Sequence, residues 1–309
     1  MASNYHIGID LGGTKIEVAV LDSQEKILFR ERLLTEAHLG SEHIFNQIHL
    51  LYTKAVVSIQ NKTHTLGLGT PGSISKKTHL LKNSNTLCLN GLPLQSLLED
   101  KLVHDIVIEN DANCFALAEA LMGAGKGYPS VFGVIMGTGC GGGIVFDGKI
   151  RQGPQNIAGE WGHMVIDPQG SPCYCGANGC VESFISGGGL ERRIQDKTGS
   201  TLSAMDFFNT PLKNESLKKI KQDFYARFGQ ALANLINILD PDIVVLGGGL
   251  SNEQSLYKEG INEVYARIFN DVPTTPIVKK HAGGFSGRDW CCFNWSRTYS
   301  VIVFSFSIL

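Results

Sequence analysis

The chain has 309 residues, of which 43% are apolar, so it is long enough for two domains with separate cores. Its net charge of −2 comes from 27 basic and 29 acidic residues without a basic run that would follow a phosphate backbone, which argues against a nucleic-acid partner. No stretch reaches the ~20 apolar residues that cross a bilayer, and no signal-peptide pattern precedes residue 7, so we expect no membrane partner and a cytoplasmic location.

The first part of the chain predicts a sheet that opens with a hairpin. Residues 7–10 and 16–22 have the apolar alternation of two strands, and glycines at 12 and 13 give the turn between them. A third strand is predicted at 27–32. Further along we expect, in order, a helix, two short buried strands and an alanine-rich helix, at residues 41–59, 66–69, 106–108 and 112–122.

The pattern then repeats in outline. A strand at 131–136, a glycine turn at 137–139 and a strand at 142–148 form a second hairpin, which indicates a duplicated unit. A cysteine-rich insertion, a long amphipathic helix that ends at Asp240, and a strand at 243–246 follow. We therefore expect an α/β protein with an N-terminal lobe at 1–118 and a C-terminal lobe at 119–282 that carries the cysteine insertion.

The glycine turns at strand ends are candidate phosphate sites. A turn without Cβ atoms lets backbone N–H groups approach phosphate oxygens, and an adjacent aspartate can face a hydrated Mg²⁺. One such turn alone is most often an ordinary hairpin, but three of them favour a polyphosphate ligand. None fits the P-loop or the dinucleotide fingerprint. The residues concerned are Asp10, Gly12, Gly13, Thr14, Lys15, Gly137, Thr138, Gly139, Gly247, Gly248 and Gly249.

A group of one histidine and three cysteines predicts a metal site. His163, Cys173, Cys175 and Cys180 provide an imidazole and three thiolates, a set that suits tetrahedral Zn²⁺. All four positions would be filled by protein groups, so we expect the Zn²⁺ to be structural. The alternative is a loop with three free cysteines.

Several segments resemble the ROK family of repressors, open reading frames and sugar kinases. The resemblance runs from residue 7 to about residue 280, with motifs in the order and spacing of the family, and the segments 69–75, 82–85, 89–91 and 172–176 point to a subgroup within it. Among ROK proteins the sequence is most similar to bacterial fructokinases that also act on mannose, with N-acetylglucosamine kinases second. The resemblance implies a two-lobed actin-like, ribonuclease-H-like fold, Mg²⁺–ATP between the lobes, phosphoryl transfer to a hexose hydroxyl, and a homodimer.

Asp111 is the candidate catalytic base. It follows a predicted strand and precedes a predicted helix, whose N-terminus would keep a carboxylate ionised. Taken alone it could be a simple helix N-cap. The segment 109–113 resembles the catalytic segment of the ROK kinases, and this favours the base.

The sugar would be held by side chains that can pair with hydroxyl groups. Asn110 can donate and accept at once, and the resemblance implies hydroxyl-binding roles for further polar residues. These are Glu160, His163 and Glu182, with Asn83 and Asn85 as weaker candidates for which a solvated loop is an equal alternative.

Two non-enzymatic alternatives exist. ROK repressors carry a helix-turn-helix domain before the first glycine turn, whereas only six residues precede Ile7 here. A sugar sensor without turnover is the second alternative. Turnover assays with several hexoses would separate a kinase from such a sensor.

The end of the chain departs from the ROK pattern. ROK kinases continue with a segment like Gly-Asp-Ser-x-Gly, but residues 283–309 do not match it. Suitable codons for residues 283–292, read one nucleotide later, can spell such a segment. We hypothesise a frameshift near Gly283 and expect residues 283–309 to pack poorly.

Overall fold

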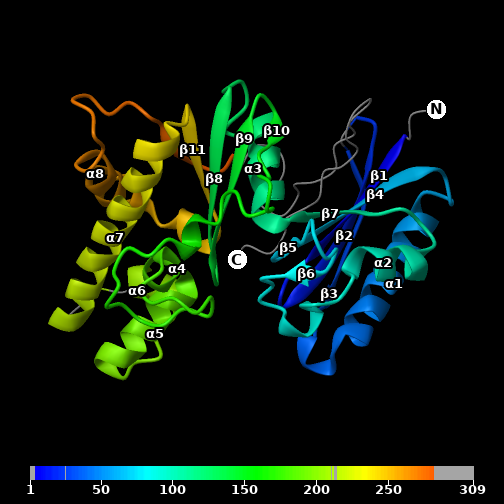
Figure 1. Cartoon of the computed structure of the whole chain (residues 1–309), viewed down its shortest axis with the longest axis horizontal. Coiled ribbons are helices and arrows are strands. Elements are labelled where there is room, and N and C mark those ends of the chain that lie inside the picture. The colour runs from blue at the N-terminus through cyan, green and yellow to red at the C-terminus, as the bar shows by residue number, and fades with distance from the viewer. Residues whose placement is uncertain (1–3, 25, 210, 212–213, 282–309) are drawn as a thin grey trace. The chain divides into compact units, whose positions relative to one another are not determined.

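A computed structural model describes residues 4–24, 26–209, 211 and 214–281 (Figure 1). The described chain divides into two compact units. The first contains the chain through Ala118 together with Gln152–Ala158, and the second contains Glu119–Arg151 and Gly159–His281. The tail hypothesised to be frameshifted, at 283–309, lies outside the described residues.

The first unit is built on a five-stranded sheet with the order β3-β2-β1-β4-β7. Its strands are β1 (Tyr5–Leu11), β2 (Lys15–Asp22), β3 (Ile27–Leu34), β4 (His64–Thr70) and β7 (Val107–Asn110). β1 pairs antiparallel with β2 and parallel with β4, while β2 pairs antiparallel with β3, and β4 parallel with β7. The predicted hairpin and third strand are therefore confirmed.

The apolar face of this sheet packs against helix α1 (Ser41–Ser58), which lies beside the sheet in Figure 1. Alternate side chains of β1 and β2 point to this face because strand side chains alternate. The buried core residues here include Ile7, Ile9, Leu11, Ile16, Val18, Val20, Ile44, Ile48 and Leu51. The smaller elements are η1 (Ala37–Leu39), β5 (Ser73–Ile74), β6 (Leu81–Lys82), η2 (Leu87–Leu89) and α2 (Leu94–Leu102).

The opposite face of the sheet is polar at the carboxyl end of the parallel strands. Across the sheet the register aligns Arg32, Glu17, Asp10, Gly69 and Glu109 in one row. β7 continues two residues beyond the predicted strand end, because Glu109 and Asn110 still pair with β4. Helix α3 (Asp111–Leu121) follows at once and passes from the first unit into the second.

The second unit repeats the topology of the first. Its sheet has the order β10-β9-β8-β11-β12, with strands β8 (Ser130–Met136), β9 (Cys140–Phe146), β10 (Lys149–Ile150), β11 (Ile243–Gly247) and β12 (Ile277–Lys279). β8 pairs antiparallel with β9 and parallel with β11, as β1 does with β2 and β4. The predicted duplication is therefore present in the pairing of the strands.

The long helix α7 (Glu215–Leu239) covers the core of the second unit. Phe224, Phe228 and Leu232 are fully buried on one face, as the amphipathic pattern predicts, and Asp240 ends the helix in a left-handed conformation. The other helical elements are η3 (Trp161–His163), α4 (Val181–Ile185), α5 (Gly187–Thr198), α6 (Ala204–Asn209), η4 (Gly249–Asn252), η5 (Gln254–Tyr257) and α8 (Glu259–Tyr265). Among the described helices, none has both the length and the apolar character needed to span a bilayer.

Candidate active site and metal centre

The first glycine turn joins β1 to β2 at residues 12–14. The Gly12 N–H donates to the Lys15 carbonyl at 3.0 Å, and the Thr35 hydroxyl donates to the Gly12 carbonyl at 2.6 Å. Gly13 and Thr14 are exposed at the tip. A Cβ on Gly13 would lie 3.7 Å from Asn85 Oδ1, so the structure places the predicted residue Asn85 beside this turn.

Asp10 precedes this turn on β1 and is only 1% exposed. It lies opposite Glu17, and two carboxylates in such a cross-strand pair repel each other. Arg30 and Arg32 of β3 form ion pairs with Glu17 and offset its charge. The carboxylate of Asp10 is the type of oxygen ligand that Mg²⁺ takes, usually with several waters, so this position fits the predicted role.

Asn110 and Asp111 occupy the start of helix α3. Asn110 Oδ1 accepts the N–H groups of Ala112 at 2.9 Å and of Asn113 at 3.1 Å, which is the geometry of an N-cap. Asn110, rather than Asp111, is thus the capping residue. Asp111 lies in the first turn and accepts the Ala112 N–H through Oδ1 at 2.8 Å. The helix N-terminus favours negative charge at this position.

The amide group of Asn110 also donates to the Gly72 carbonyl at 3.0 Å. Gly72 has a φ of +84°, and a Cβ there would lie 2.4 Å from the Lys82 carbonyl oxygen, so no other residue fits. Asn83, the residue after Lys82, has a left-handed conformation with a φ of 61°. The structure therefore brings the predicted residues Asn83 and Asn110 to the same turn.

The second glycine turn, at 137–139, joins β8 to β9 and contacts the start of helix α5. The Gly187 N–H donates to the Gly137 carbonyl at 2.7 Å, and the Gly188 N–H donates to the Thr138 carbonyl at 3.1 Å. A Cβ on Gly187 would lie 2.9 Å from the Gly137 carbonyl oxygen. This contact was not predicted, although the run of a capping serine and three glycines at 186–189 is a signal for a helix start.

The third glycine turn, at 247–249, lies against the end of β8. Gly248 has a φ of +85°, and a Cβ there would lie 2.2 Å from the Met136 carbonyl oxygen. The Ser251 hydroxyl donates to the Gly248 carbonyl at 2.7 Å and holds the turn. Because Met136 directly precedes Gly137, the two predicted glycine turns of the second unit adjoin each other.

The segment 159–163 lies against β9 through close backbone contacts. Cβ atoms on Gly159 and Gly162 would lie 2.4 Å from the Gly142 carbonyl oxygen and 2.0 Å from the Cys140 carbonyl oxygen. The Trp161 indole N–H donates to the Gly141 carbonyl at 2.9 Å. These contacts fix Glu160 and His163 next to the start of β9.

Glu182, on helix α4, also reaches the start of β9. Its Oε2 accepts the backbone N–H of Cys140 at 3.0 Å. Burial raises the pKa of Tyr174, and the negative charges of Glu182 and Glu160 raise it further. Both glutamates are therefore close enough to Tyr174 to raise the pKa of its hydroxyl by their charge. Three predicted sugar-binding residues, Glu160, His163 and Glu182, gather at this place in the second unit.

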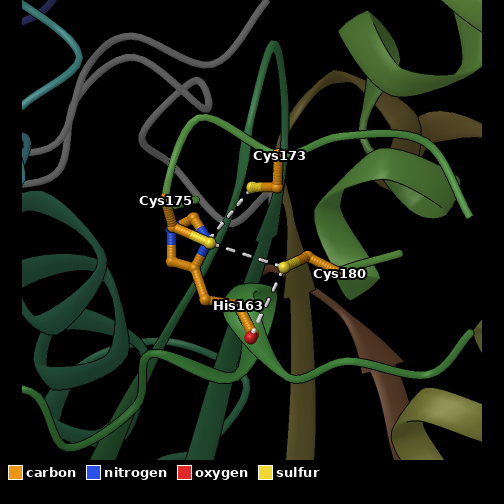
Figure 2. A group of neighbouring side chains, drawn as sticks. All are labelled: His163, Cys173, Cys175 and Cys180. Atoms are coloured by element: carbon orange, nitrogen blue, oxygen red, sulfur yellow. Dashed lines mark hydrogen bonds between the residues drawn. The ribbon is translucent and has the colours of Figure 1, made fainter. Parts of the chain in front are cut away.

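The predicted metal ligands converge in space (Figure 2). The ligand atoms of His163, Cys173, Cys175 and Cys180 all lie within 4.8 Å of one another. With metal–sulfur bonds of about 2.3 Å, neighbouring ligand atoms of a tetrahedral site lie about 3.8 Å apart. The Cys175 and Cys180 sulfur atoms are 3.6 Å apart, and His163 Nδ1 is 3.6 Å from Cys173 Sγ. The four side chains therefore fit a tetrahedral ion.

The imidazole of His163 is oriented from both sides. Its Nδ1 faces the cysteine sulfurs, while its Nε2 lies 3.0 Å from the hydroxyl of Tyr174. A hydrogen bond on the distal nitrogen is the usual support for a metal-binding histidine. Burial and the neighbouring sulfur atoms raise the pKa of Cys180 to about 12, so a cation is needed to hold this thiol as thiolate at neutral pH.

The sequence profile of the ROK family matches residues 6–288. The chain belongs to the ROK family. The predicted membership of the ROK family is thus confirmed.

Individual ROK proteins match the chain over most of its length. An N-acetyl-D-glucosamine kinase of Histophilus somni (strain 129Pt) is 35% identical over 294 residues, which cover 91% of this chain and 95% of that protein. The crystal structure of a ROK hexokinase from Thermus thermophilus superimposes with a TM-score of 0.79 at 27% identity, covering 91% of this chain and 94% of that one. A ROK glucokinase from Streptomyces griseus, crystallised with glucose and AMPPNP, gives a TM-score of 0.75 at 27% identity, with coverage of 91% and 95%.

These matches and the duplicated sheets agree on the fold. The chain has the α/β actin-like ATPase fold of the ROK proteins, with a Cys/His group in the second unit that can bind a metal. The predicted site residues divide between the two units. Motif reasoning missed Glu109, Asn113, Tyr174 and the glycines at 187–189, all of which contact predicted residues.

Proposed function

We propose that this chain is an ATP-dependent sugar kinase. The observation that carries this proposal is the repeated glycine turn, at 12–14 and at 137–139, that closes the first hairpin of two sheets with one topology. The turn of the first unit lies in the unit that also contains Asp111. A polyphosphate held by such turns, beside a carboxylate at a helix N-terminus, is what phosphoryl transfer to an alcohol requires.

The reaction needs alignment, charge neutralisation and a proton acceptor. A sugar hydroxyl oxygen forms a bond to the γ-phosphorus of ATP, the bond from that phosphorus to the β–γ bridging oxygen breaks, and ADP leaves with its electron pair. Asp111 accepts the hydroxyl proton. Asp10 would hold Mg²⁺, which neutralises phosphate charge when bound. The glycine turns would bind the phosphates through backbone N–H groups.

Polar groups that can pair with sugar hydroxyls are present in each unit. In the second unit, Glu160, Glu182 and the His163 segment are held by backbone contacts to β9, so they need little reordering to bind a ligand. In the first unit, Asn110 uses its oxygen for the helix cap and one N–H for Gly72, so only its second N–H serves a hydroxyl.

We also propose that the Cys/His group holds a structural Zn²⁺. An ion there would fix the knuckle that carries Tyr174 and the imidazole of His163. Purified chain should contain about one zinc per molecule by elemental analysis. Cys173→Ser should lose the metal and weaken sugar binding, whereas Cys88→Ser, whose sulfur lies near Ala37, should change neither. Sugar affinity that survives complete zinc removal would contradict this link.

The substrate within the hexoses is a separate proposal. The kinase of Histophilus somni that resembles this chain acts on N-acetyl-D-glucosamine, which makes this sugar the first candidate. Fructose, favoured by the motifs at 69–75 and 82–85, stays the second candidate. Because both sugars carry a primary alcohol, the same chemistry serves either one.

A coupled assay for ADP formation tests these proposals. The chain is assayed with ATP and, in turn, N-acetylglucosamine, N-acetylmannosamine, glucose, mannose and fructose. We expect the highest kcat/KM for N-acetylglucosamine. A higher value for fructose would overturn the substrate proposal and leave the kinase proposal intact. Binding of a sugar by calorimetry without turnover of any would overturn the kinase proposal and indicate a sugar sensor.

A further inference from the structure

Glu109 is the first residue of the predicted catalytic segment 109–113, and its two carboxylate oxygens contact different parts of the first unit. Oε1 accepts the backbone N–H of Asn110 at 2.9 Å and the amide group of Asn113 at 2.9 Å. These two bonds lie on either side of Asp111 in the chain. Glu109 therefore connects the end of β7 to the first turn of α3, and Asp111 lies within this connection.

The other oxygen of Glu109 reaches a segment that is distant in sequence. Oε2 accepts the side-chain amide of Gln152 at 2.5 Å. Gln152 begins the segment Gln152–Ala158, which belongs to the first unit although both of its neighbours in the chain belong to the second. We refer to Gln152–Ala158 as the strap.

The strap is attached to the first unit at further points. Lys76 Nζ donates to the Gly153 carbonyl at 2.8 Å, and Lys82 Nζ donates to the Gln155 carbonyl at 3.1 Å. The amide of Asn156 donates to the Ile74 carbonyl at 2.9 Å. Three of the four contacts thus end at the turn region 74–82, and only the contact from Gln152 ends at the catalytic segment. The carboxylate of Glu109 is the one group among them that joins the strap to the start of α3.

The strap also leads directly into the predicted sugar-binding segment. Ala158, its last residue, is followed by Gly159 and Glu160. Gly159 has a φ of +94° and lies against Gly142, so the first residue after the strap is held by a contact within the second unit. Glu109 is thus linked through bonds and a short stretch of chain to residues on which sugar binding is proposed to depend.

We propose that Glu109 is a positioning residue for Asp111, and that its bond to Gln152 couples the strap to the start of helix α3. This inference rests on the proposed kinase function. Glu109 takes no proton and need not touch the sugar. It binds the backbone N–H of Asn110 and the side-chain amide of Asn113, on either side of Asp111, so its loss displaces the base without removing it.

Variants at 109 and 152 test this role. In Glu109→Ala all three bonds are lost, and we expect kcat to fall by about tenfold to 100-fold, because small displacements of a reacting group have effects of this size. Glu109→Gln keeps an oxygen for Asn110 and Asn113, and its amide can pair with Gln152 after that side chain turns, so most of kcat should return. Gln152→Ala should cause a smaller loss, and the losses in Glu109→Ala and Gln152→Ala should not add in the double variant.

The controls separate positioning from stability and from the proposed function. Gln155→Ala changes an exposed side chain of the same strap and should leave kcat unchanged. Sugar affinity by calorimetry and the melting temperature should change little in Glu109→Gln and Gln152→Ala. Wild type and Asp111→Asn are measured in the same assay, so absence of turnover in wild type identifies a failure of the kinase proposal.

Two results would overturn the positioning role. The first is a kcat in Glu109→Ala equal to that of wild type while Asp111→Asn is inactive. The second is a loss of kcat in Glu109→Ala and Gln152→Ala that is fully additive and accompanied by equal losses of sugar affinity. If Glu109→Ala does not fold, Gln152→Ala decides the matter, because a loss of kcat without a loss of sugar affinity supports the coupling and an unchanged kcat refutes it.

Discussion

Asn110 caps the helix that begins at Asp111. Its side-chain oxygen accepts the N–H groups of the second and third helical residues, Ala112 and Asn113. Both asparagine and aspartate are good capping residues, and the two stand next to each other here. Asn110, the first of the two, is the capping residue. Asp111 therefore lies in the first turn of the helix.

The capping bonds of Asn110 should make a measurable contribution to the free energy of unfolding. Asn110→Ala removes the capping oxygen and should lower the free energy of unfolding by about 1 kcal/mol. Asn110→Asp keeps an acceptor in the same place and should cost less, although its bond to the Gly72 carbonyl is lost. Urea unfolding followed by circular dichroism gives both values. Equal stability of Asn110→Ala and wild type would show that another residue caps the helix.

Asp111→Asn tests the proposed base without large changes in shape. Sugar affinity should be nearly unchanged, whereas kcat should fall by about 10² to 10⁴-fold, the range for loss of general base catalysis. The measurement combines calorimetry for affinity with steady-state kinetics for kcat. Asp100→Asn, on helix α2, is a matched control in the same unit and should leave kcat unchanged. Turnover that survives in Asp111→Asn would mean that another group accepts the proton.

The sequence predicted those features that depend on neighbouring residues in the chain. The glycine turns at 12–14 and 137–139, the strands around them and the long helix α7 all carry local patterns of period and turn residues. The cysteine spacing likewise predicted which four ligand groups would meet.

Features that depend on contacts between distant segments could not be predicted in this way. β7 extends to Asn110 because Gly69 and Thr70 continue to pair with it, and nothing near Asn110 in the sequence shows this. The bond of Glu182 to Cys140 and that of Glu109 to Gln152 each join positions more than 40 residues apart. Local patterns carry no information on such pairs.

Tyr174 should raise the metal affinity of the Cys/His group through its hydrogen bond to His163. Its hydroxyl lies 3.0 Å from Nε2, and a lost hydrogen bond of this kind costs about 10-fold to 100-fold in metal affinity. Tyr174→Phe keeps the ring contact, in which the two ring centres are 5.1 Å apart, and removes only the hydroxyl. Competition with a chelating dye measures the zinc affinity. Tyr128→Phe, on a different loop, should behave as wild type, and an unchanged affinity in Tyr174→Phe would exclude this support.

Gly179 should be required for the metal-binding loop. A Cβ at this position would lie 1.6 Å from the Asp167 carbonyl oxygen, and its φ is +66°. Gly176 has a similar positive φ of +93° but open space around it. Gly179→Ala should therefore lower the melting temperature and zinc content much more than Gly176→Ala, since only the first adds a clash to the backbone strain. Equal effects of the two variants would show that backbone strain alone, without the clash, determines the loss of stability and of zinc.

Glu119 should make the stability of the second unit depend on pH. It is fully buried on helix α3, where its Oε2 accepts the N–H groups of Ala124 at 2.8 Å and His281 at 3.3 Å. Burial raises the pKa of this carboxyl above its ordinary value of 4.5, although these bonds and the charge of Lys280 oppose the shift. The folded state therefore binds the proton of Glu119 more tightly than the unfolded state does.

The sign of the effect follows from this difference. Below the ordinary pKa of 4.5 Glu119 is protonated in both states, and as the pH rises from there toward the raised pKa the stability that it contributes is lost. Glu119→Gln is neutral throughout, so wild type should become less stable relative to this variant as the pH rises above 4.5. Urea unfolding at several pH values measures the difference, and Glu42→Gln, at an exposed surface pair with Lys101, is the control. A difference between wild type and Glu119→Gln that stays constant over this range would show that Glu119 has the same proton affinity in both states.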